Sequence, residues 1–323
     1  MVSIKDVAKH AGVAISTVSK VLNNYPNVSE ATRKKVNAAV EELNFVPNSV
    51  AAALSSKNAG RVALIIDLYV TTQALDEIAM RYISGAITKA MELNLDVITL
   101  FLFMFQDKTK EELIRYLKSQ SISGIIIYGV SEDEQLLQEL IASESFKCVI
   151  VDEDHVSENT SCVTINQKQA QYDVAKALLE EIHAKKILYI SGYELSYVTK
   201  KRLEGMEAIA QEKGIQLLVK YANFSETEAK EIALQYGKDV DAICCASDLM
   251  AIGAKKAMKE LQIERPICGF DGISLMEYVG NGIYTVSQNF SDISAIAMEE
   301  LHSLMAGNTG KAIEAEYQLV RNL

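Results

Sequence analysis

From Arg61 onward the sequence repeats one pattern, in which a short aliphatic run is followed by an amphipathic segment of helical length and then by another run. Such runs indicate buried strands, and strands that alternate with helices form parallel sheets joined by right-handed crossovers. The pattern therefore predicts an α/β fold of two doubly wound parallel sheets. The expected strands are Val62–Ile66, Asp96–Leu102, Gly124–Tyr128, Cys148–Val151, Lys186–Ile190, Gln216–Lys220, Ala242–Ala246 and Pro266–Phe270.

Composition narrows the class of protein. The 323 residues exceed the usual size of a single core, and 49% hydrophobic residues with 3 prolines favour well-packed globular structure. The opening residues carry charges where a signal peptide needs an apolar run, and no apolar stretch approaches the roughly 20 residues that span a bilayer. We therefore expect a cytoplasmic protein with no membrane partner.

The five cysteines are odd in number, lie within or beside apolar runs and show no paired metal spacing. Free cysteine behaves as a small hydrophobic residue, so buried thiols are expected and no metal site is assigned. The four histidines are scattered, and neither a nucleophile with a base partner nor a glycine loop for phosphates is found. We therefore expect a protein that is not an enzyme and holds no cofactor.

The first 60 residues differ from the rest in charge. Seven Lys or Arg and four Asp or Glu give these residues a charge of +3. Since the whole chain carries −11, the remaining residues carry −14. A basic head on an acidic body suits phosphate binding by the head alone, because the body is repelled by a polyanion. This asymmetry favours a nucleic-acid partner for the head.

Three short helices are expected in the head. Ser3 and Asp6 have the spacing of a capping box before a helix that should end near Ala11, and Gly12 supplies the turn after it. A second helix follows from Ile15, and Ser29 with Glu30 opens a third. The second and third helices should bury Val18, Val21, Leu22, Val36, Val40 and Leu43.

Residues Gly12–Asn23 (GVAISTVSKVLN) match the turn and second helix of a helix-turn-helix, whose N-terminal side chains enter the major groove. Lys20 can donate to guanine, and Ser16 and Thr17 can bond a base or a phosphate. Ile15 offers only apolar contact, for example to a thymine methyl. On the pattern alone, a solvent-exposed helix on a small helical cap is the alternative.

The segment IKDVAKHAGVAISTVSKVLNN, followed by VSEATRKKVNAAVEELNFVPN, resembles the head of the lactose-repressor (LacI/GalR) family of bacterial transcription regulators. Four later segments fit the same family, so the resemblance covers essentially the whole chain. They are RLEG at Arg202–Gly205, ASDLMAIGA at Ala246–Ala254, GFDG at Gly269–Gly272 and SQNF at Ser287–Phe290.

The resemblance implies three parts. Residues 1–46 form the helix-turn-helix domain, 47–60 a hinge helix and linker, and 61–323 an effector-binding and dimerisation core like a periplasmic binding protein. Within the core, the N-subdomain is expected at about 61–159 and 288–317, and the C-subdomain at about 160–287 and 318–323.

The resemblance also implies roles for individual head residues. It puts base readout on Ile15, Ser16 and Lys20, and contacts with the DNA backbone on Thr17, Ser19, Asn23, Ser29, Thr32 and Asn48.

The hinge helix Pro47–Leu54 would bring Leu54 into the minor groove as an apolar wedge that bends the duplex, although a plain linker helix with a buried leucine is the alternative. Two residues depart from the family pattern. Ala14 replaces a serine that caps the recognition helix, and Ala52 replaces a common arginine. Loss of such a cap typically costs about 1 kcal/mol.

For the core, the resemblance implies an effector pocket between two lobes, lined by Asp152, Arg202, Phe224, Ser247, Asp271, Gln288 and Phe290. Carboxylates accept hydrogen bonds from vicinal hydroxyls, arginine donates to oxygens, and an aromatic face stacks on a sugar ring. This mixture favours a sugar or phosphosugar. Arg202 could instead pair structurally with Glu204 or Asp271, and Asp248 is expected to accept the first amides of a helix rather than touch a ligand.

The expected mechanism is that of a homodimer which reads a near-palindromic operator in double-stranded DNA, as a repressor of carbohydrate metabolism genes. Effector binding would rotate the lobes and change operator affinity. One alternative is control by a protein corepressor, as in the catabolite-control branch of the family. A free solute-binding protein is a remote alternative. The apolar segment Leu100–Phe105 is expected to be a core edge or a dimer contact, with a protein-docking surface as the alternative.

Overall fold

A computed structural model of the chain divides into two compact units, residues 1–60 and 61–323. The structure describes residues 2–22, 25, 27–45, 60–66, 73–279 and 282–321. Among the described residues, no helix has the length and apolarity needed to cross a membrane.

The head consists of the three predicted helices, α1 (Ile4–Ala11), α2 (Ile15–Leu22) and α3 (Glu30–Glu42). The Ser3 amide donates to the Asp6 carboxylate at the start of α1 (2.9 Å), and Gly12 ends that helix with a φ of 64°. This left-handed conformation favours glycine because a side chain would clash with the backbone. The helices bury a small core of Val7, Ala8, Val18, Val21, Val36 and Ala39, against which Leu22, Val40 and Leu43 are partly buried.

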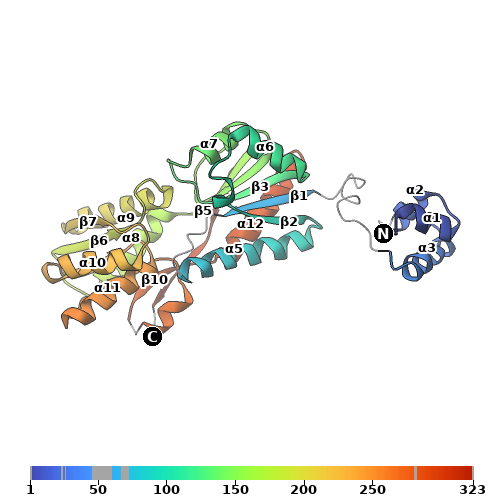
Figure 1. Cartoon of the computed structure of the whole chain (residues 1–323). Helices are drawn as coiled ribbons and strands as arrows, with labels where there is room; N and C mark the ends of the chain where they lie inside the picture. Colours follow the sequence, from blue (N-terminus) through green and yellow to red (C-terminus); the bar gives the residue numbers. More distant parts are fainter. Residues whose placement is uncertain are drawn as a thin grey trace. The chain divides into compact units, whose positions relative to one another are not determined.

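The core unit contains two six-stranded sheets with related strand orders, β11-β5-β4-β3-β1-β2 and β12-β10-β9-β8-β6-β7 (Figure 1). All pairs in the first sheet are parallel, and in the second only β12 is antiparallel to its neighbour β10. The first sheet comprises β1 (Arg61–Ile66), β2 (Asp96–Phe101), β3 (Ile122–Tyr128), β4 (Lys147–Val151), β5 (Thr160–Ile165) and β11 (Ala312–Ala315). The second comprises β6 (Lys186–Ser191), β7 (Gln216–Tyr221), β8 (Ala242–Cys245), β9 (Ile267–Cys268), β10 (Tyr284–Gln288) and β12 (Tyr317–Arg321).

Helices cover both faces of the first sheet. In Figure 1, α5 (Gln73–Glu92) and α12 (Phe290–Met305) lie along one face, and α6 (Lys110–Ser119) and α7 (Gln135–Ala142) along the other. The strand β1, which lies between β3 and the edge strand β2, is buried on both sides, which explains why it is an almost unbroken aliphatic run. The sheet with these four helices is called the first lobe.

The second sheet carries two packed helix pairs and forms the second lobe. The pairs are α8 (Gln167–Leu179) with α9 (Tyr197–Lys213), and α10 (Glu226–Tyr236) with α11 (Asp248–Leu261). Short 3₁₀ segments complete both lobes: η1 (Leu102–Phe105), η2 (Gly237–Asp239) and η3 (Ser274–Tyr278).

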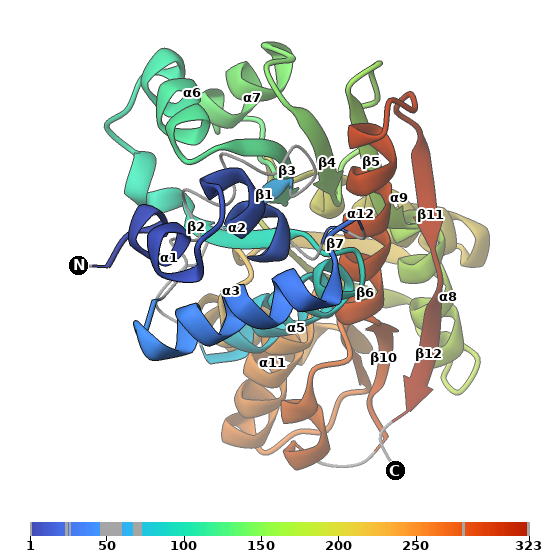
Figure 2. The same ribbon diagram turned by 90° about the vertical axis from the view of Figure 1, so that its right-hand side faces the viewer.

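The predicted fold class is confirmed, but the sequence pattern did not reveal four strands, β5, β10, β11 and β12. These strands mix polar with apolar residues, as in Thr160–Ile165, or are exposed over most of their length, as β12 is. Because β5 pairs with β4, the first lobe extends to Ile165, six residues beyond the boundary that was expected at about 159. The chain returns to the first lobe at α12 and leaves it again between β11 and β12 (Figure 2).

All five cysteines are buried free thiols, as predicted. The segment Leu100–Phe105 divides in two, because Leu100 and Phe105 are buried whereas Phe103 and Met104 are 51% and 47% exposed. The rings of Phe101 and Phe103 stack, with their centroids 5.8 Å apart. The interpretation of this segment as a core edge therefore accounts for only part of it.

Candidate functional site

One exposed face of α2 presents the side chains that were predicted to read bases, from Ile15 at its start to Lys20 in its last turn. Ile15 is 45% exposed, and Ser16 and Lys20 are exposed as well. Val18 and Val21 on the opposite side of the helix anchor it in the head core. The helix therefore offers one polar face with one apolar side chain, which is the surface that a recognition helix needs. Thr17 and Ser19 lie half-buried at its margins.

The start of α3 forms a second polar surface. Ser29 caps the helix by accepting a hydrogen bond from the Thr32 amide, and the Ser29 and Thr32 hydroxyls lie 2.9 Å apart. Arg33, one residue further, donates to the Tyr25 carbonyl. Both hydroxyls are positioned at a helix N-terminus, where phosphate oxygens are favoured.

Several residues predicted to contact DNA, together with the predicted hinge helix, are not described by the structure. Asn23, Asn48, Leu54, Ala52 and the hinge helix expected at Pro47–Leu54 lie outside the described residues. Ala14 occupies the position before α2, and its carbonyl accepts from the Thr17 amide at 2.9 Å. An alanine cannot add the side-chain cap that a serine would supply.

In the core unit, the candidate residues gather at the carboxyl ends of parallel strands. Asp152 follows β4, Ser247 follows β8, Asp271 follows β9, and Gln288 ends β10. In open parallel sheets, ligands bind outside the carboxyl ends of the strands, near the point where the strand order reverses. The two sheets thus present the predicted effector residues at the junction of the two lobes.

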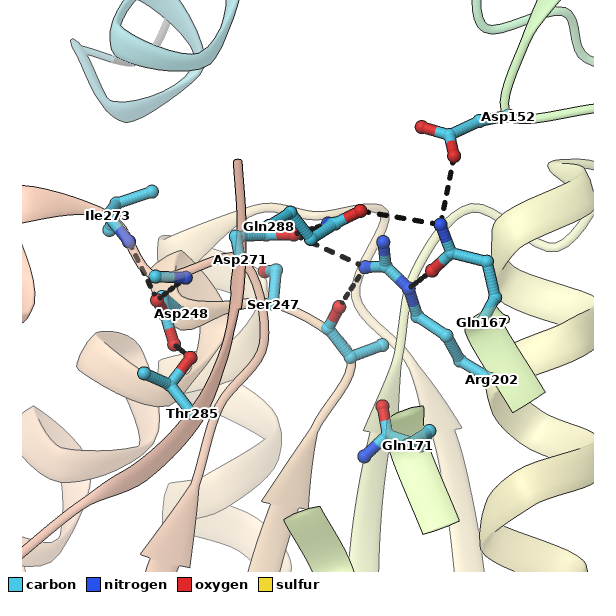
Figure 3. A network of polar contacts seen from close by, with 12 residues as sticks. Asp152, Gln167, Gln171, Arg202, Ser247, Asp248, Asp271, Ile273, Thr285 and Gln288 are labelled. Carbon is cyan, nitrogen blue, oxygen red and sulfur yellow. Dashed lines mark hydrogen bonds and ion pairs between the residues drawn. The ribbon is translucent and has the colours of Figure 1, made fainter. Parts of the chain in front are cut away.

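Arg202 of α9 lies at the centre of these residues and is buried (Figure 3). Its Nη1 donates to the Ala246 carbonyl (2.6 Å) and faces the Asp271 carboxylate (3.5 Å), and its Nε donates to the Gln167 side-chain oxygen (2.9 Å). The guanidinium also lies 3.8 Å from the ring centre of Phe270. The structural pairing with Asp271, which was the alternative to ligand contact, is therefore present, whereas Glu204 pairs with Lys168 and Lys201.

Asp152 receives hydrogen bonds from both lobes. Tyr82 of α5 and Thr164 of β5 donate from the first lobe (3.2 and 2.9 Å), and Gln167 of α8 donates from the second (2.9 Å). Desolvation raises the pKa of Asp152, and Arg202 opposes that shift by attraction. We call Tyr82, Asp152, Gln167, Arg202, Asp271 and Gln288 the inter-lobe network.

Asp271 lies in a strained backbone conformation, with a φ of 117°. Non-glycine residues in sparsely populated conformations cluster at functional sites, where the surroundings hold them in place. Gln288 donates to its carboxylate at 3.0 Å, and the Asp271 amide donates to the Val286 carbonyl. Burial raises the pKa of Asp271 to about 7, although Arg202 and Gln288 oppose the shift.

The structure corrects the role predicted for Asp248. Ser247, which was assigned to the ligand, is the residue that caps α11, because its hydroxyl accepts from the Met250 amide (3.2 Å). The buried Asp248 carboxylate instead accepts from the amides of Gly272 and Ile273 and from the Thr285 hydroxyl (Figure 3). Asp248 thereby fixes the loop that carries Asp271.

The two predicted aromatic residues differ in their surroundings. Phe290 begins α12, is buried, and packs edge-on against Tyr82 with ring centres 5.1 Å apart. Phe224 is partly buried with a φ of 58°, and its ring fills the space beside Gly192 at the end of β6. A Cβ at residue 192 would lie 2.1 Å from that ring. The two rings thus lie near strand ends of different lobes.

Tyr82, Thr164 and Gln167 were not predicted as site residues. Gln167 begins α8 directly after β5, a strand that the apolar pattern did not reveal. Tyr82 lies on a helix where an aromatic residue signals only a buried face. Nothing in the local sequence distinguishes these residues from ordinary core and helix-start positions.

Further contacts join the lobes outside the network. The segment that follows β3 meets the start of α9, where Ser131 and Ser196 form an isolated bridge and Lys200 pairs with Glu132. Elsewhere, Glu77 of α5 accepts from the Ser274 amide and hydroxyl. The inter-lobe network is thus accompanied by two sets of more exposed polar contacts.

Comparison with known proteins agrees with this architecture. Residues 3–48 match the model of "Bacterial regulatory proteins, lacI family", and residues 112–309 match "Periplasmic binding protein domain". Catabolite control protein A of Staphylococcus aureus strain Mu50 is 31% identical, over 94% of this chain and 92% of that protein. The ribose operon repressor of Halalkalibacterium halodurans is 29% identical, over 92% and 88% respectively.

Among solved structures, the lac repressor dimer bound to operator and the anti-inducer ONPF has the same fold. Its TM-score is 0.83 at 23% identity, and the match covers 99% of this chain and 98% of that one. Together with the full-length similarity to catabolite control protein A, these matches show that the chain belongs to the lacI family of bacterial regulatory proteins, which are DNA-binding transcription regulators.

Proposed function

We propose that this protein is a repressor of carbohydrate metabolism genes, which binds a near-palindromic operator as a homodimer and changes its operator affinity when a sugar binds between the lobes. The observation that carries the proposal is the inter-lobe network, which joins side chains of both lobes at the carboxyl ends of their strands. A ligand that replaces these contacts would bias the lobe arrangement, and such coupling typically amounts to about 1 to 3 kcal/mol. The similarity to a ribose operon repressor supports a sugar as the effector.

The charges around the network favour a neutral sugar over a phosphosugar. Asp271 lies 3.5 Å from Arg202 and Asp152 interacts with Arg202 through space, and Arg202 is the one buried cationic side chain among the residues that the structure describes. Three hydrogen-bond acceptors already engage that guanidinium. A phosphate at this place would meet carboxylates without a free cation, whereas sugar hydroxyls can donate to them.

Exposed apolar side chains on the first lobe support the homodimer. Met80, Ile87 and Met91 of α5 are exposed at helical spacing, and Phe103 and Met104 follow the edge strand β2. Apolar patches of this kind mark interaction sites. We propose that a second copy of the chain covers them, which would place two heads on the half-sites of one operator.

The proposal is tested by selecting operators from a pool of random palindromic duplexes, with and without a panel of neutral sugars and their phosphates. A palindromic consensus whose affinity one neutral sugar changes is the expected result. An Asp271→Asn variant should lose the sugar response and keep operator affinity, whereas Asp107→Asn, at an exposed position, should keep both. The absence of any consensus would contradict the regulator itself, and a response to phosphosugars alone would contradict the effector class.

Control by a protein corepressor is the second candidate, because Phe103 and Met104 are exposed and could serve a different protein. Sedimentation of a Met104→Glu variant distinguishes a homodimer surface from a corepressor surface at these residues. Dissociation into monomers supports the homodimer surface. A dimer that persists while the sugar panel has no effect on the wild type would favour the corepressor.

A further inference from the structure

We infer that Gln167 is a positioning residue for the effector, because its carboxamide aligns Arg202 of the second lobe with Asp152 of the first. The inference rests on the proposed function insofar as Arg202 and Asp152 are effector contacts. That one neutral side chain joins the two lobes can be tested without a ligand.

The two ends of the Gln167 side chain have opposite polarity, and each meets its complement. The oxygen accepts from Arg202 Nε at 2.9 Å, whereas the amide nitrogen donates to Asp152 Oδ1 at 2.9 Å and faces Gln288 Oε1 at 3.4 Å (Figure 3). Gln167 is only 2% exposed. A buried polar group left without its partners costs about 1 to 3 kcal/mol, so the carboxamide is held in this orientation by both neighbours.

Arg202 and Asp152 make no direct contact among the described hydrogen bonds and ion pairs, although the charge of Arg202 opposes, through space, the rise in the pKa of Asp152 that burial causes. Gln167 therefore fills the place between a guanidinium and a carboxylate. An effector hydroxyl, which both donates and accepts, has the same pair of polarities. Gln167 thus holds in place the donor, Arg202, and the acceptor, Asp152, that such a hydroxyl would meet. It does so from α8, the helix that follows the crossing of the chain between the lobes.

A glutamate at residue 167 supplies a chemical test of this arrangement. When protonated, a carboxylic acid can accept from Arg202 and donate to Asp152 as the amide does, but the ionised form can no longer donate to Asp152 and repels it. The charged groups that contact this position are Asp152 and Arg202; behind them, Tyr82 donates to Asp152 and Asp271 faces Arg202. Arg202 lowers the pKa of a glutamate at residue 167, whereas burial beside Asp152 raises it. Burial outweighs Arg202 for the neighbouring Asp152 and Asp271, so we expect the titration of this glutamate to move toward neutral pH.

The measurement is the distance distribution between spin labels on the two lobes in the full chain without ligand. Labels are placed at Lys118→Cys on α6 and Lys259→Cys on α11, which are exposed, whereas the native cysteines are buried. Wild type, Gln167→Ala, Gln167→Glu and Gln169→Ala are compared between pH 5.5 and 8.5. Gln169 lies on the same helix but is exposed, and it serves as the matched control.

We expect Gln167→Ala to broaden the distribution at every pH, and Gln167→Glu to match wild type at pH 5.5 and depart from it at pH 8.5. Gln169→Ala should follow wild type throughout. Any pH dependence that comes from the native carboxylates also appears in the wild-type profile and is subtracted. The inference is overturned if Gln167→Ala matches wild type, because the outer contacts would then suffice to hold the lobes. It is also overturned if Gln167→Glu departs equally at both pH values. If Gln167→Ala does not fold, the pH dependence of Gln167→Glu decides.

The same variants distinguish this inference from the proposed function. A sugar found in the panel should bind Gln167→Ala at least tenfold more weakly than Gln169→Ala. If no sugar binds the wild type while the distance profile follows the expectation, the effector assignment fails and the role of Gln167 in joining the lobes stands.

Discussion

The close crossing of α5 and α12 at Gly85 gives a prediction that rests on geometry alone. A Cβ built on Gly85 would lie 2.0 Å from the Ser291 carbonyl oxygen and 2.7 Å from its Cα. Real Cβ atoms essentially never approach other atoms within 3.0 Å. Gly85→Ala must therefore separate the two helices by about 1 Å at this point, since the obstacle is backbone and cannot rotate away.

The magnitude follows from two opposing effects. Overpacking of a close contact costs about 1 to 3 kcal/mol, and the upper part of that range applies because backbone must move. Alanine regains up to about 1 kcal/mol over glycine within a helix. We expect a net destabilisation of about 2 kcal/mol, which corresponds to a loss of about 5 °C in Tm for a unit of this size.

Thermal unfolding of the full chain, followed by circular dichroism, measures this loss. Ser84→Ala, at the exposed neighbouring position on the same helix, is the control and should unfold at the wild-type temperature. The shift should also reach the site, because Phe290 precedes Ser291 and packs against Tyr82. A Gly85→Ala protein as stable as Ser84→Ala would refute the reasoning.

Three further predictions concern protonation, capping and base readout. Burial raises the pKa of Asp248 to about 8 from an ordinary 3.8, so the folded protein retains a proton that the unfolded chain has lost. Stability should therefore fall as pH rises from about 5 toward 8, by up to about 1.4 kcal/mol per pH unit for this proton. Asp248→Asn, which can keep the hydrogen bonds, should flatten that slope in urea titrations, and an unchanged slope would show that another group titrates. Ser29→Ala removes the cap of α3 and should accelerate amide hydrogen exchange in that helix about fivefold, equivalent to about 1 kcal/mol. Exchange as slow as in the wild type would contradict this role of Ser29. Lys20→Ala should relax the preference at one operator base by about 1 to 3 kcal/mol, whereas uniform weakening across all sequences would assign Lys20 to a phosphate.

The network also shows how far each site residue could be inferred from the sequence. Arg202 and Asp271 belong to segments that resemble a family, and the structure brings these two side chains to within 3.5 Å of each other. Glu204 was an equally reasonable partner for Arg202, because it is two residues away on the same helix. Residues two apart on a helix do not face each other, and Glu204 pairs with lysines instead. Spatial proximity decided between the two partners.

The sequence alone determined the features that depend on near neighbours. The period of the apolar residues placed the buried strands β1, β3 and β4, and the cap residues Ser3 and Ser29 set the starts of two head helices. Gly12 marked a turn because few other residues adopt its backbone conformation. These signals are local because a cap or a helical face involves residues within about four positions of one another.

Only the tertiary structure decided how distant segments meet. The strands β5 and β10–β12 are short and partly polar, so pairing with strands far away in the chain makes them strands. Ser247 rather than Asp248 caps α11, because the backbone amides of Gly272 and Ile273 compete for the aspartate. Gln167 joins two lobes because the chain crosses between them directly before α8. Buried polar groups take whichever partner the fold brings within reach, and that choice is not written in any one segment of the sequence.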